Sequence, residues 1–408
     1  VIGGSTAGTG NVISGNNEQG IYLGVSTPNV AIKGNIIGLN AAGTATVGNN
    51  LEGIRVEGST NLQIGGILAA ERNIISGNGL SGIYLSSTTS AATISNNYIG
   101  VSLSGTVSLG NGFYGIYVNG SPNTQIGGVA AAARNVIGGN QLSGVFVGLG
   151  STSTVIEGNY IGLGADGTTD VGNGEDGILV NTTTGQTIGG VAVGQRNVIS
   201  GNTQYGIHIG TGASSSIIQG NYIGTDASGT TAVGNGFGGI LIQNANSNTI
   251  GGSVSGSGNL ISGNGLYGIT IQNSLSNTIA GNYIGTNAAG LAAVGNQLSG
   301  IYLLNSTLNT IGGTAALAQN LISGNTVNGI ELVSGSNSNT IKGNLIGTDI
   351  TGLAALANLN AGVFLAASLS NTITQNVVSG NATNGIELTS NSNNNIISRN
   401  FVGTNKNG

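Results

Sequence analysis

His208 is the only histidine in this sequence of 408 residues, and it stands in the stretch QYGIHIG. An imidazole is a common general base near neutral pH, so a lone histidine is the first candidate for catalysis. The chain has no cysteine, which excludes disulfides and thiolate metal sites. Whether His208 acts as a base depends on the residues that occupy the same position elsewhere in the chain.

A second group of candidates lies in the acidic stretch GLGADGTTDVGNGEDG, which contains Asp166, Asp170, Glu175 and Asp176. Carboxylate oxygens are ligands of calcium, and Asp166, Asp170 and Asp176 would converge on one ion if this segment folds back. A solvated acidic turn explains the same residues without a metal. Calcium is the only cofactor that the sequence suggests, and no lysine or arginine stands in the same register to act as a base.

Composition limits the partners of the chain. It has 78 glycines and only 21 charged residues, and its formal net charge is -5 without any cluster of lysine and arginine. Nucleic acid is therefore not an expected partner. No apolar run approaches the ~20 residues that span a bilayer. The plentiful aliphatic residues argue against disorder.

The whole chain is built from one repeat. A tetrad G-[IV]-x-[LVI] recurs with spacings that alternate near 33 and 29 residues, so the complete unit is a pair of about 62 residues. The tetrads begin at Gly20, Gly53, Gly82, Gly115, Gly144, Gly177, Gly206, Gly239, Gly268, Gly300, Gly329, Gly362 and Gly385.

An asparagine stands four residues before each of these glycines. At a constant position in stacked repeats, each amide can bond to the next one, so the asparagines predict a structural ladder. They are Asn16, Asn49, Asn78, Asn111, Asn140, Asn173, Asn202, Asn235, Asn264, Asn296, Asn325, Asn358 and Asn381.

Each repeat holds three short segments in which apolar and small or polar residues alternate, as in GVFL, NTIT and NVVSG from residue 362 onward. This is the period of a β-strand. A repeat of about 23 residues cannot bury its apolar face alone, so the repeats must stack as rungs. The sequence therefore predicts an all-β parallel β-helix with three strands per rung and about 13 rungs, forming one domain over residues 1–408.

The motifs NVISGN, NTIxGNYIG and GNxxxGIxL resemble the repeats of the pectate-lyase-like superfamily along essentially the whole chain. The resemblance implies a right-handed β-helix. It implies no single function, because that superfamily includes polysaccharide lyases, hydrolases and epimerases as well as adhesins, tailspikes and bacterial surface proteins. Both ends interrupt the repeat without a recognisable cap, so we expect a segment of a longer chain.

The third tetrad position should point outward, because its neighbours point into the core. There, His208 lies between Leu179 and Leu241 on the adjacent rungs, neither of which can orient an imidazole, and we predict no catalytic role for it. The row of residues that could face a ligand is Tyr22, Arg55, Tyr84, Tyr117, Phe146, His208, Tyr302 and Phe364.

Regularity favours a non-catalytic structural or adhesive module of a secreted or cell-surface bacterial protein, able to form filaments by self-assembly. No enzymatic activity is expected on this hypothesis. The alternative is a protein that binds or cleaves an extracellular polysaccharide, whose sugar rings would stack on the flat faces of Tyr84, Tyr117 and Phe146.

A third hypothesis, ice binding, rests on an outward threonine row on five successive rungs. The row beside it is mixed, so a matched array is missing. The threonines are Thr249, Thr278, Thr310, Thr340 and Thr372, and the row beside them is Gly251, Ala280, Gly312, Lys342 and Thr374.

Overall fold

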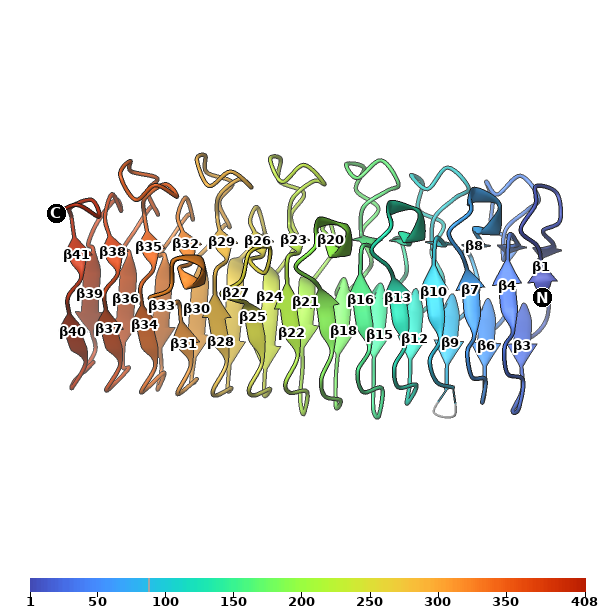
Figure 1. Ribbon diagram of the computed structural model, residues 1–408, viewed down its shortest axis with the longest axis horizontal. Coiled ribbons are helices and arrows are strands. Elements are labelled where there is room, and N and C mark those ends of the chain that lie inside the picture. The colour runs from blue at the N-terminus through green and yellow to red at the C-terminus, as the bar shows by residue number, and fades with distance from the viewer. Residues whose placement is uncertain (87–88) are drawn as a thin grey trace. The chain divides into compact units, whose positions relative to one another are not determined.

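The computed structural model describes residues 1–86 and 89–408. The chain divides into two compact units, residues 1–207 and 208–408, and each unit is a coil of short parallel strands (Figure 1). Among the described residues, the only helical segments are the 3₁₀ turns η1 (Ala69–Glu71), η2 (Ala131–Ala133), η3 (Val193–Gln195) and η4 (Ala316–Ala318). None of the described helices is long and apolar enough to cross a membrane.

In the first unit, every third strand belongs to the same sheet. The first sheet contains β1 (Ile2–Gly3), β4 (Ala31–Lys33), β7 (Gln63–Gly65), β10 (Thr93–Ser95), β13 (Gln125–Gly127), β16 (Val155–Glu157) and β19 (Thr187–Gly189). The second contains β2 (Val12–Ile13), β5 (Ile36–Ile37), β8 (Ile74–Ile75), β11 (Tyr98–Ile99), β14 (Val136–Ile137), β17 (Tyr160–Ile161) and β20 (Val198–Ile199). The third contains β3 (Ile21–Leu23), β6 (Ile54–Val56), β9 (Ile83–Leu85), β12 (Ile116–Val118), β15 (Val145–Val147) and β18 (Ile178–Val180), and β21 (Tyr205–Ile209) includes the boundary between the units.

The second unit repeats this order. Its first sheet contains β22 (Ile217–Gln219), β25 (Thr249–Gly251), β28 (Thr278–Ala280), β31 (Thr310–Ile311), β34 (Thr340–Lys342), β37 (Thr372–Thr374) and β40 (Ile396–Ser398). Its second contains β23 (Tyr222–Ile223), β26 (Leu260–Ile261), β29 (Tyr283–Ile284), β32 (Leu321–Ile322), β35 (Leu345–Ile346), β38 (Val377–Val378) and β41 (Phe401–Val402). Its third contains β24 (Gly238–Gln243), β27 (Tyr267–Gln272), β30 (Ile301–Leu304), β33 (Ile330–Val333), β36 (Val363–Ala366) and β39 (Ile386–Thr389).

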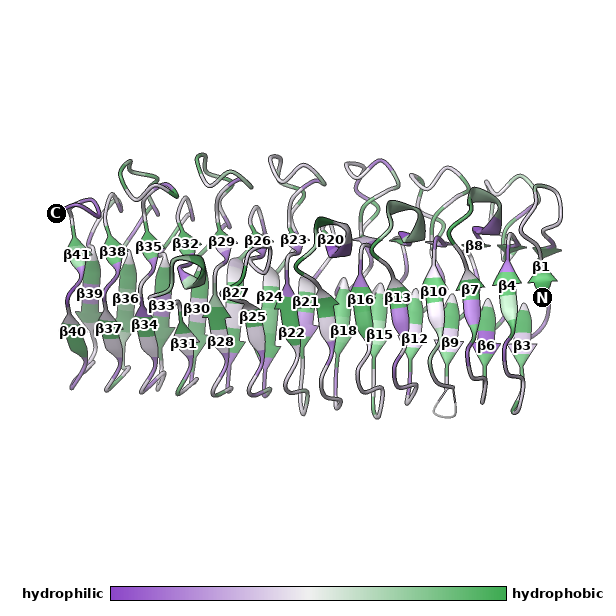
Figure 2. Cartoon of the chain, in the orientation of Figure 1, coloured by the Kyte–Doolittle hydropathy of each residue, from purple (hydrophilic) through white to green (hydrophobic). Residues whose placement is uncertain are grey.

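The core of each unit is a column of aliphatic side chains stacked in register. In the first sheet, Ile94 pairs with Ile64 on one side and Ile126 on the other, and all three are fully buried. The strands alternate buried and partly exposed positions, as in Ile54 and Val56 on either side of Arg55, and Figure 2 shows hydrophobic residues concentrated in the strands. Burial of these aliphatic columns is the main source of stability. A single rung exposes both its faces, so the columns are buried only when rungs stack.

Glycine is required where the chain turns out of a first-sheet strand. Gly65 has a φ of +85°, and a Cβ there would overlap the carbonyl oxygen of Ser95 on the next rung. The insert that carries η1 begins directly after this turn. The chain therefore passes close to the neighbouring rung before it leaves the coil.

These observations confirm the predicted fold, an all-β, right-handed parallel β-helix with three short strands per rung. The described residues contain thirteen strands of the third sheet, in agreement with the expected number of rungs. The division into a single domain stays a prediction.

Candidate functional site

The outward residues of the third sheet form a continuous row in the first unit. Tyr22 pairs with Arg55, Arg55 with Tyr84, and Tyr84 with Tyr117, and the register continues through Phe146. Tyr22 is 55% exposed, whereas the other four side chains are half-buried. The row lies outside the coil because the residues on both sides of each member point into the core.

Four aromatic rings gather at the middle of this row. Tyr117 stacks on Phe146 with ring centroids 5.0 Å apart and an interplanar angle of 25°, and Tyr84 meets Tyr117 edge-on at 5.1 Å. Tyr114 contacts both Tyr117 and Phe146. Because these rings pack against one another, the cluster presents ring edges and hydroxyl groups rather than the row of flat faces that we expected.

A charged group adjoins the aromatic cluster at the β6 rung. The Arg55 guanidinium contacts Glu57 Oε1 at 2.7 Å and Glu52 Oε1 at 3.3 Å, and it lies over the Tyr84 ring, 4.9 Å from its centroid. The Tyr22 hydroxyl donates to Glu57 at 2.9 Å. This hydrogen bond raises the pKa of Tyr22, while the bond from Arg55 is the largest cause of the lowered pKa of Glu57.

Two carboxylates adjoin the cluster at the β18 rung. Asp176 is buried and accepts the backbone N–H of Tyr205 at 3.0 Å, and Glu175 is half-buried beside it. Burial, followed by the charge of Glu175, raises the pKa of Tyr114. Burial and the charge of Asp176 likewise raise the pKa of Tyr205. These tyrosines therefore keep their protons near neutral pH, so that their hydroxyls are able to donate hydrogen bonds.

Sequence reasoning missed Tyr114, Glu52 and Asp176 as members of this face. All three occupy the position immediately before the tetrad glycine. The side chains of Tyr114 and Glu52 reach the outward row, and Asp176 accepts the backbone N–H of Tyr205, which has the same position on the next rung. The same position holds Tyr267 in the second unit, which stacks on Tyr302 at 4.4 Å and 17°. Reading this position as a second row would have revealed the site.

The remaining residues of the predicted row lie in the second unit. His208 is a half-buried residue of β21, and the prediction that it is not a base stays a prediction. Tyr302 pairs with Glu331, and Phe364 lies between Glu331 and Glu387. Burial and then the charge of Glu331 raise the pKa of Tyr302.

The predicted convergence of three aspartates on calcium is wrong. Asp166 accepts the backbone N–H groups of Thr168 and Thr169, Asp170 accepts that of Gly172, and Asp176 faces a different strand. Among the described residues, no three His, Cys, Asp or Glu side chains are grouped so that they could hold a metal ion. Asp166 and Asp170 cap their own local backbone instead, whereas Asp176 bonds to the backbone of the next rung.

Asp166 caps backbone N–H groups of its corner. In another repeat, an asparagine that stands two residues earlier in the equivalent corner has this role. In the first of these corners, Asn40 accepts the N–H groups of Thr44 and Ala45. The corner of the acidic stretch has Gly164 at the position of Asn40, and Asp166 supplies the missing acceptor. Burial opposes its ionisation, but the hydrogen bonds from Thr169 and Thr168 outweigh that effect and lower the pKa of Asp166 to about 2.

The thirteen predicted asparagines form an amide ladder in each unit. Asn16 donates to Asn49, and the chain of amide bonds continues to Asn202 in the first unit and from Asn235 to Asn381 in the second, at 2.7–2.9 Å. These asparagines are structural, because nearly every side-chain amide is buried between its neighbours.

The structure contains further amide ladders that the sequence analysis did not predict. One follows the corner before the second-sheet strands, at 2.8–3.1 Å in the first unit and 2.8–3.0 Å in the second. Its members are Asn11, Asn35, Asn73, Asn97, Asn135, Asn159 and Asn197, then Asn221, Asn259, Asn282, Asn320, Asn344, Asn376 and Asn400. A shorter ladder in the second unit runs through Asn248, Asn277, Asn309, Asn339 and Asn371 at 3.1–3.2 Å.

The threonine row considered for ice binding pairs strand by strand from Thr249 to Thr372, and all its members are half-buried. Beside it, Gly251 pairs with Ala280, and Lys342 with Thr374. Ice binding by this face stays a prediction.

Comparison with known proteins gives one family model and several solved structures. The family model described as Periplasmic copper-binding protein (NosD) matches residues 292–408. Comparison with curated proteins gave no match.

The similar structures are distant in sequence. The periplasmic alginate epimerase AlgG is 16% identical, with a TM-score of 0.43 over 86% of this chain and 76% of that one. The A-module of the Azotobacter vinelandii mannuronan C-5 epimerase AlgE4 is 13% identical, with a TM-score of 0.42 over 93% and 91%. An alginate lyase from Paenibacillus sp. str. FPU-7 is 12% identical, with a TM-score of 0.26 over 79% and 94%.

These comparisons correct the expectation that the chain is not an enzyme. That expectation rested on the regularity of the rungs, yet the structures similar to most of this chain include two epimerases and a lyase. Regularity is therefore no ground for excluding catalysis, and the non-catalytic reading is withdrawn. The geometry establishes the fold: the chain is a parallel β-helix repeat protein.

Proposed function

We propose that the protein binds and acts on a polysaccharide that lies along the outward face of the third sheet in the first unit. The observation that carries this proposal is the cluster of Tyr84, Tyr114, Tyr117 and Phe146, which is flanked by charged side chains at both ends. Half-buried aromatic groups with polar tips are suited to ligands that are apolar in one part and hydroxylated in another.

The face is long enough for an extended chain. From Arg55 on β6 to the β18 rung is four strand-to-strand steps, or ~19 Å at ~4.8 Å per step. The ring edges contact the apolar C–H surface of sugars, while the tyrosine hydroxyls and Arg55 bond to sugar oxygens. A polymer running across the strands would meet an aromatic side chain at each of the three rungs of β9, β12 and β15.

The carboxylates at the β18 rung supply the chemistry for acting on the bound chain. A side-chain carboxylate within reach of a reacting group can transfer a proton to it or remove one from it. Glu175 is the candidate for this role, because it is half-buried and its charge raises the pKa of Tyr114. Asp176 is a positioning residue, since it is buried and holds the backbone of Tyr205.

We place the protein in the cell envelope or outside the cell, where polysaccharides are found. The matching family model is that of a periplasmic copper-binding protein, and AlgG is a periplasmic epimerase. The low number of charged residues and the absence of a basic cluster agree with a carbohydrate partner rather than nucleic acid.

Incubation with a panel of neutral and acidic polysaccharides tests this proposal. NMR spectra of the polymers are expected to reveal new reducing ends, unsaturated ends or inverted sugar centres for at least one of them. A panel in which no polymer is either bound or altered contradicts the proposal.

A further inference from the structure

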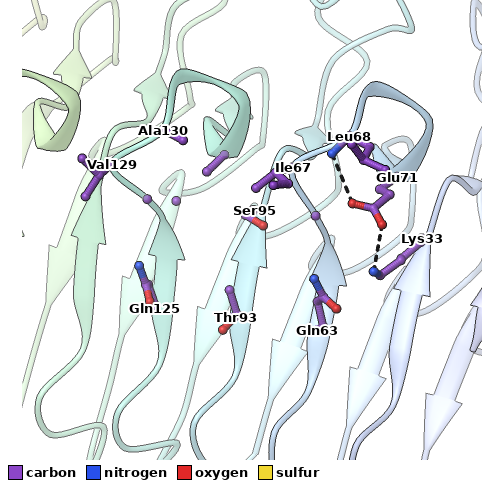
Figure 3. Close-up of a pocket in the computed structure, with 14 residues that line it drawn as sticks. Lys33, Gln63, Ile67, Leu68, Glu71, Thr93, Ser95, Gln125, Val129 and Ala130 are labelled. Carbon is purple, nitrogen blue, oxygen red and sulfur yellow. Dashed lines mark hydrogen bonds and ion pairs between the residues drawn. The ribbon is translucent and has the colours of Figure 1, made fainter. Parts of the chain in front are cut away.

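A groove of about 590 Å³ lies on a different sheet from the aromatic cluster. It runs over the first sheet of the first unit, between the insert that carries η1 and the insert that carries η2 (Figure 3). Gln63, Thr93 and Gln125 stand in line on its floor, one on each of β7, β10 and β13.

The alternation of inserts creates this groove. Inserts follow β7 and β13, whereas β10, which pairs with both strands, has only a short corner after it. The two inserts are therefore two strand-to-strand steps apart, or ~10 Å at ~4.8 Å per step. That spacing admits one flat ring between the walls.

The floor of the groove carries polar groups that no part of the described protein engages. The amide of Gln63 and the hydroxyls of Thr93 and Ser95 make no side-chain hydrogen bond to any described residue, and none of them has a further interaction elsewhere. This contrasts with the amide ladders, in which buried asparagines bond to one another. Amides and hydroxyls both donate and accept, so the floor matches the hydroxyl groups of a sugar.

The charges near the groove are already compensated. Lys33 Nζ contacts Glu71 Oε1 at 2.9 Å, and Glu71 also accepts the hydroxyl of Ser5 and the backbone N–H of Leu68. The dashed lines in Figure 3 mark the bonds of Glu71 to Lys33 and Leu68. No uncompensated charge remains on the lining to select an ionic ligand.

The walls are apolar and open to solvent. Ile67 is 62% exposed and Leu68 is 52% exposed in the first insert, and Val129 is 54% exposed in the second. Aliphatic side chains exposed on facing walls can cover both faces of a sugar ring.

We infer that this groove binds a residue of a neutral oligosaccharide, with hydroxyl groups on Gln63, Thr93, Ser95 and Gln125 and with C–H faces against the two inserts. The inference takes the saccharide class of its ligand from the proposed function. It concerns a different surface, so the two can fail separately.

Filling the groove tests the inference. Binding of maltohexaose, cellohexaose and xylohexaose is measured by isothermal titration calorimetry on the full chain. We expect at least one hexaose to bind, Thr93→Trp to lower its affinity about tenfold or more, and Gln63→Ala to lower it roughly 2- to 10-fold through one lost hydrogen bond.

Two variants serve as controls. Thr340→Trp places the same bulk at the same strand position of β34, where an insert follows only one of the two neighbouring strands, and it should leave affinity unchanged. Thr372→Trp, at the same position of β37, where an insert follows neither neighbouring strand, should likewise leave affinity unchanged. Absence of binding by all three hexaoses, or equal affinity of the wild type and Thr93→Trp, overturns the inference. The proposed function is judged separately by the polymer panel.

Discussion

The ring of Tyr117 stacks on the ring of Phe146 across two adjacent strands, with centroids 5.0 Å apart and planes 25° from parallel. This contact joins the local repeat to the candidate site, because both residues occupy the same outward position of successive rungs. The stacking fixes each ring against its neighbour, so a ligand meets a preformed surface.

Removing this ring pair should weaken polysaccharide binding while leaving the coil folded. Tyr117→Ala/Phe146→Ala is expected to weaken binding of the best polymer about tenfold or more, since the central hydrophobic contact of the face is lost. Affinity electrophoresis in polymer-containing gels measures the change. Phe364→Ala, at the same row position in the second unit, is the matched control and should migrate like the wild type. Equal retardation of both variants would remove the aromatic cluster from the account.

Replacing Glu175 should separate binding from turnover. Glu175→Gln keeps the size of the side chain but cannot exchange a proton, so we expect product formation to fall about 100-fold or more with polymer affinity unchanged. Glu18→Gln is the matched control, because Glu18 also stands two residues before a tetrad glycine. Full activity in Glu175→Gln would show that another group transfers the proton.

Because of Asp166, the stability of the fold should decrease at acidic pH. The pKa of Asp166 is lowered from 3.8 to about 2 in the folded protein. The hydrogen bonds of its carboxylate therefore stabilise the fold fully above pH 4, and this stabilisation is lost as the pH falls through about 2. The melting temperature of Asp166→Ala should therefore lie below that of the wild type at pH 7, and the gap should narrow between pH 4 and pH 2. Asp166→Asn, which keeps an acceptor as Asn40 does, is the control. A gap that stays constant down to pH 2 would contradict the assigned hydrogen bonds.

Breaking the amide ladder should destabilise the first unit. Asn111 is fully buried, accepts the amide of Asn78 and donates to Asn140, each at 2.9 Å. Asn111→Ala should cost about 1–3 kcal/mol, because both the backbone N–H and the side-chain amide of Asn78 lose the Asn111 acceptor. Urea unfolding followed by circular dichroism checks this. Asn50 is exposed, so Asn50→Ala is the control variant. An equally large decrease in the free energy of unfolding in this control would mean that the ladder does not stabilise the fold more than an exposed asparagine does.

Sequence reasoning could predict the fold because one repeat recurs thirteen times along the chain. The strand period, the inward isoleucines and the asparagine before each tetrad all follow from position alone, and the structure places them accordingly. The second amide ladder was also within reach, since Asn35, Asn73 and Asn97 stand directly before second-sheet strands.

The candidate site was less predictable because it depends on side-chain directions that the repeat does not fix. Tyr114 precedes the tetrad glycine, yet its ring turns onto Phe146 of the next rung. Gly164 has no side chain to accept the N–H groups of its corner, and Asp166 accepts them instead. Its carboxylate is therefore bonded locally and does not form a site with Asp176. Such choices follow from packing between rungs rather than from residue type.

A crystal structure of the full chain with the oligosaccharide that it binds best tests the central claim most directly. We expect saccharide density along the outward face of β9, β12 and β15, in contact with Tyr84, Tyr117 and Phe146 and within reach of Glu175. Density confined to other surfaces, or the failure of every oligosaccharide to bind, would contradict it.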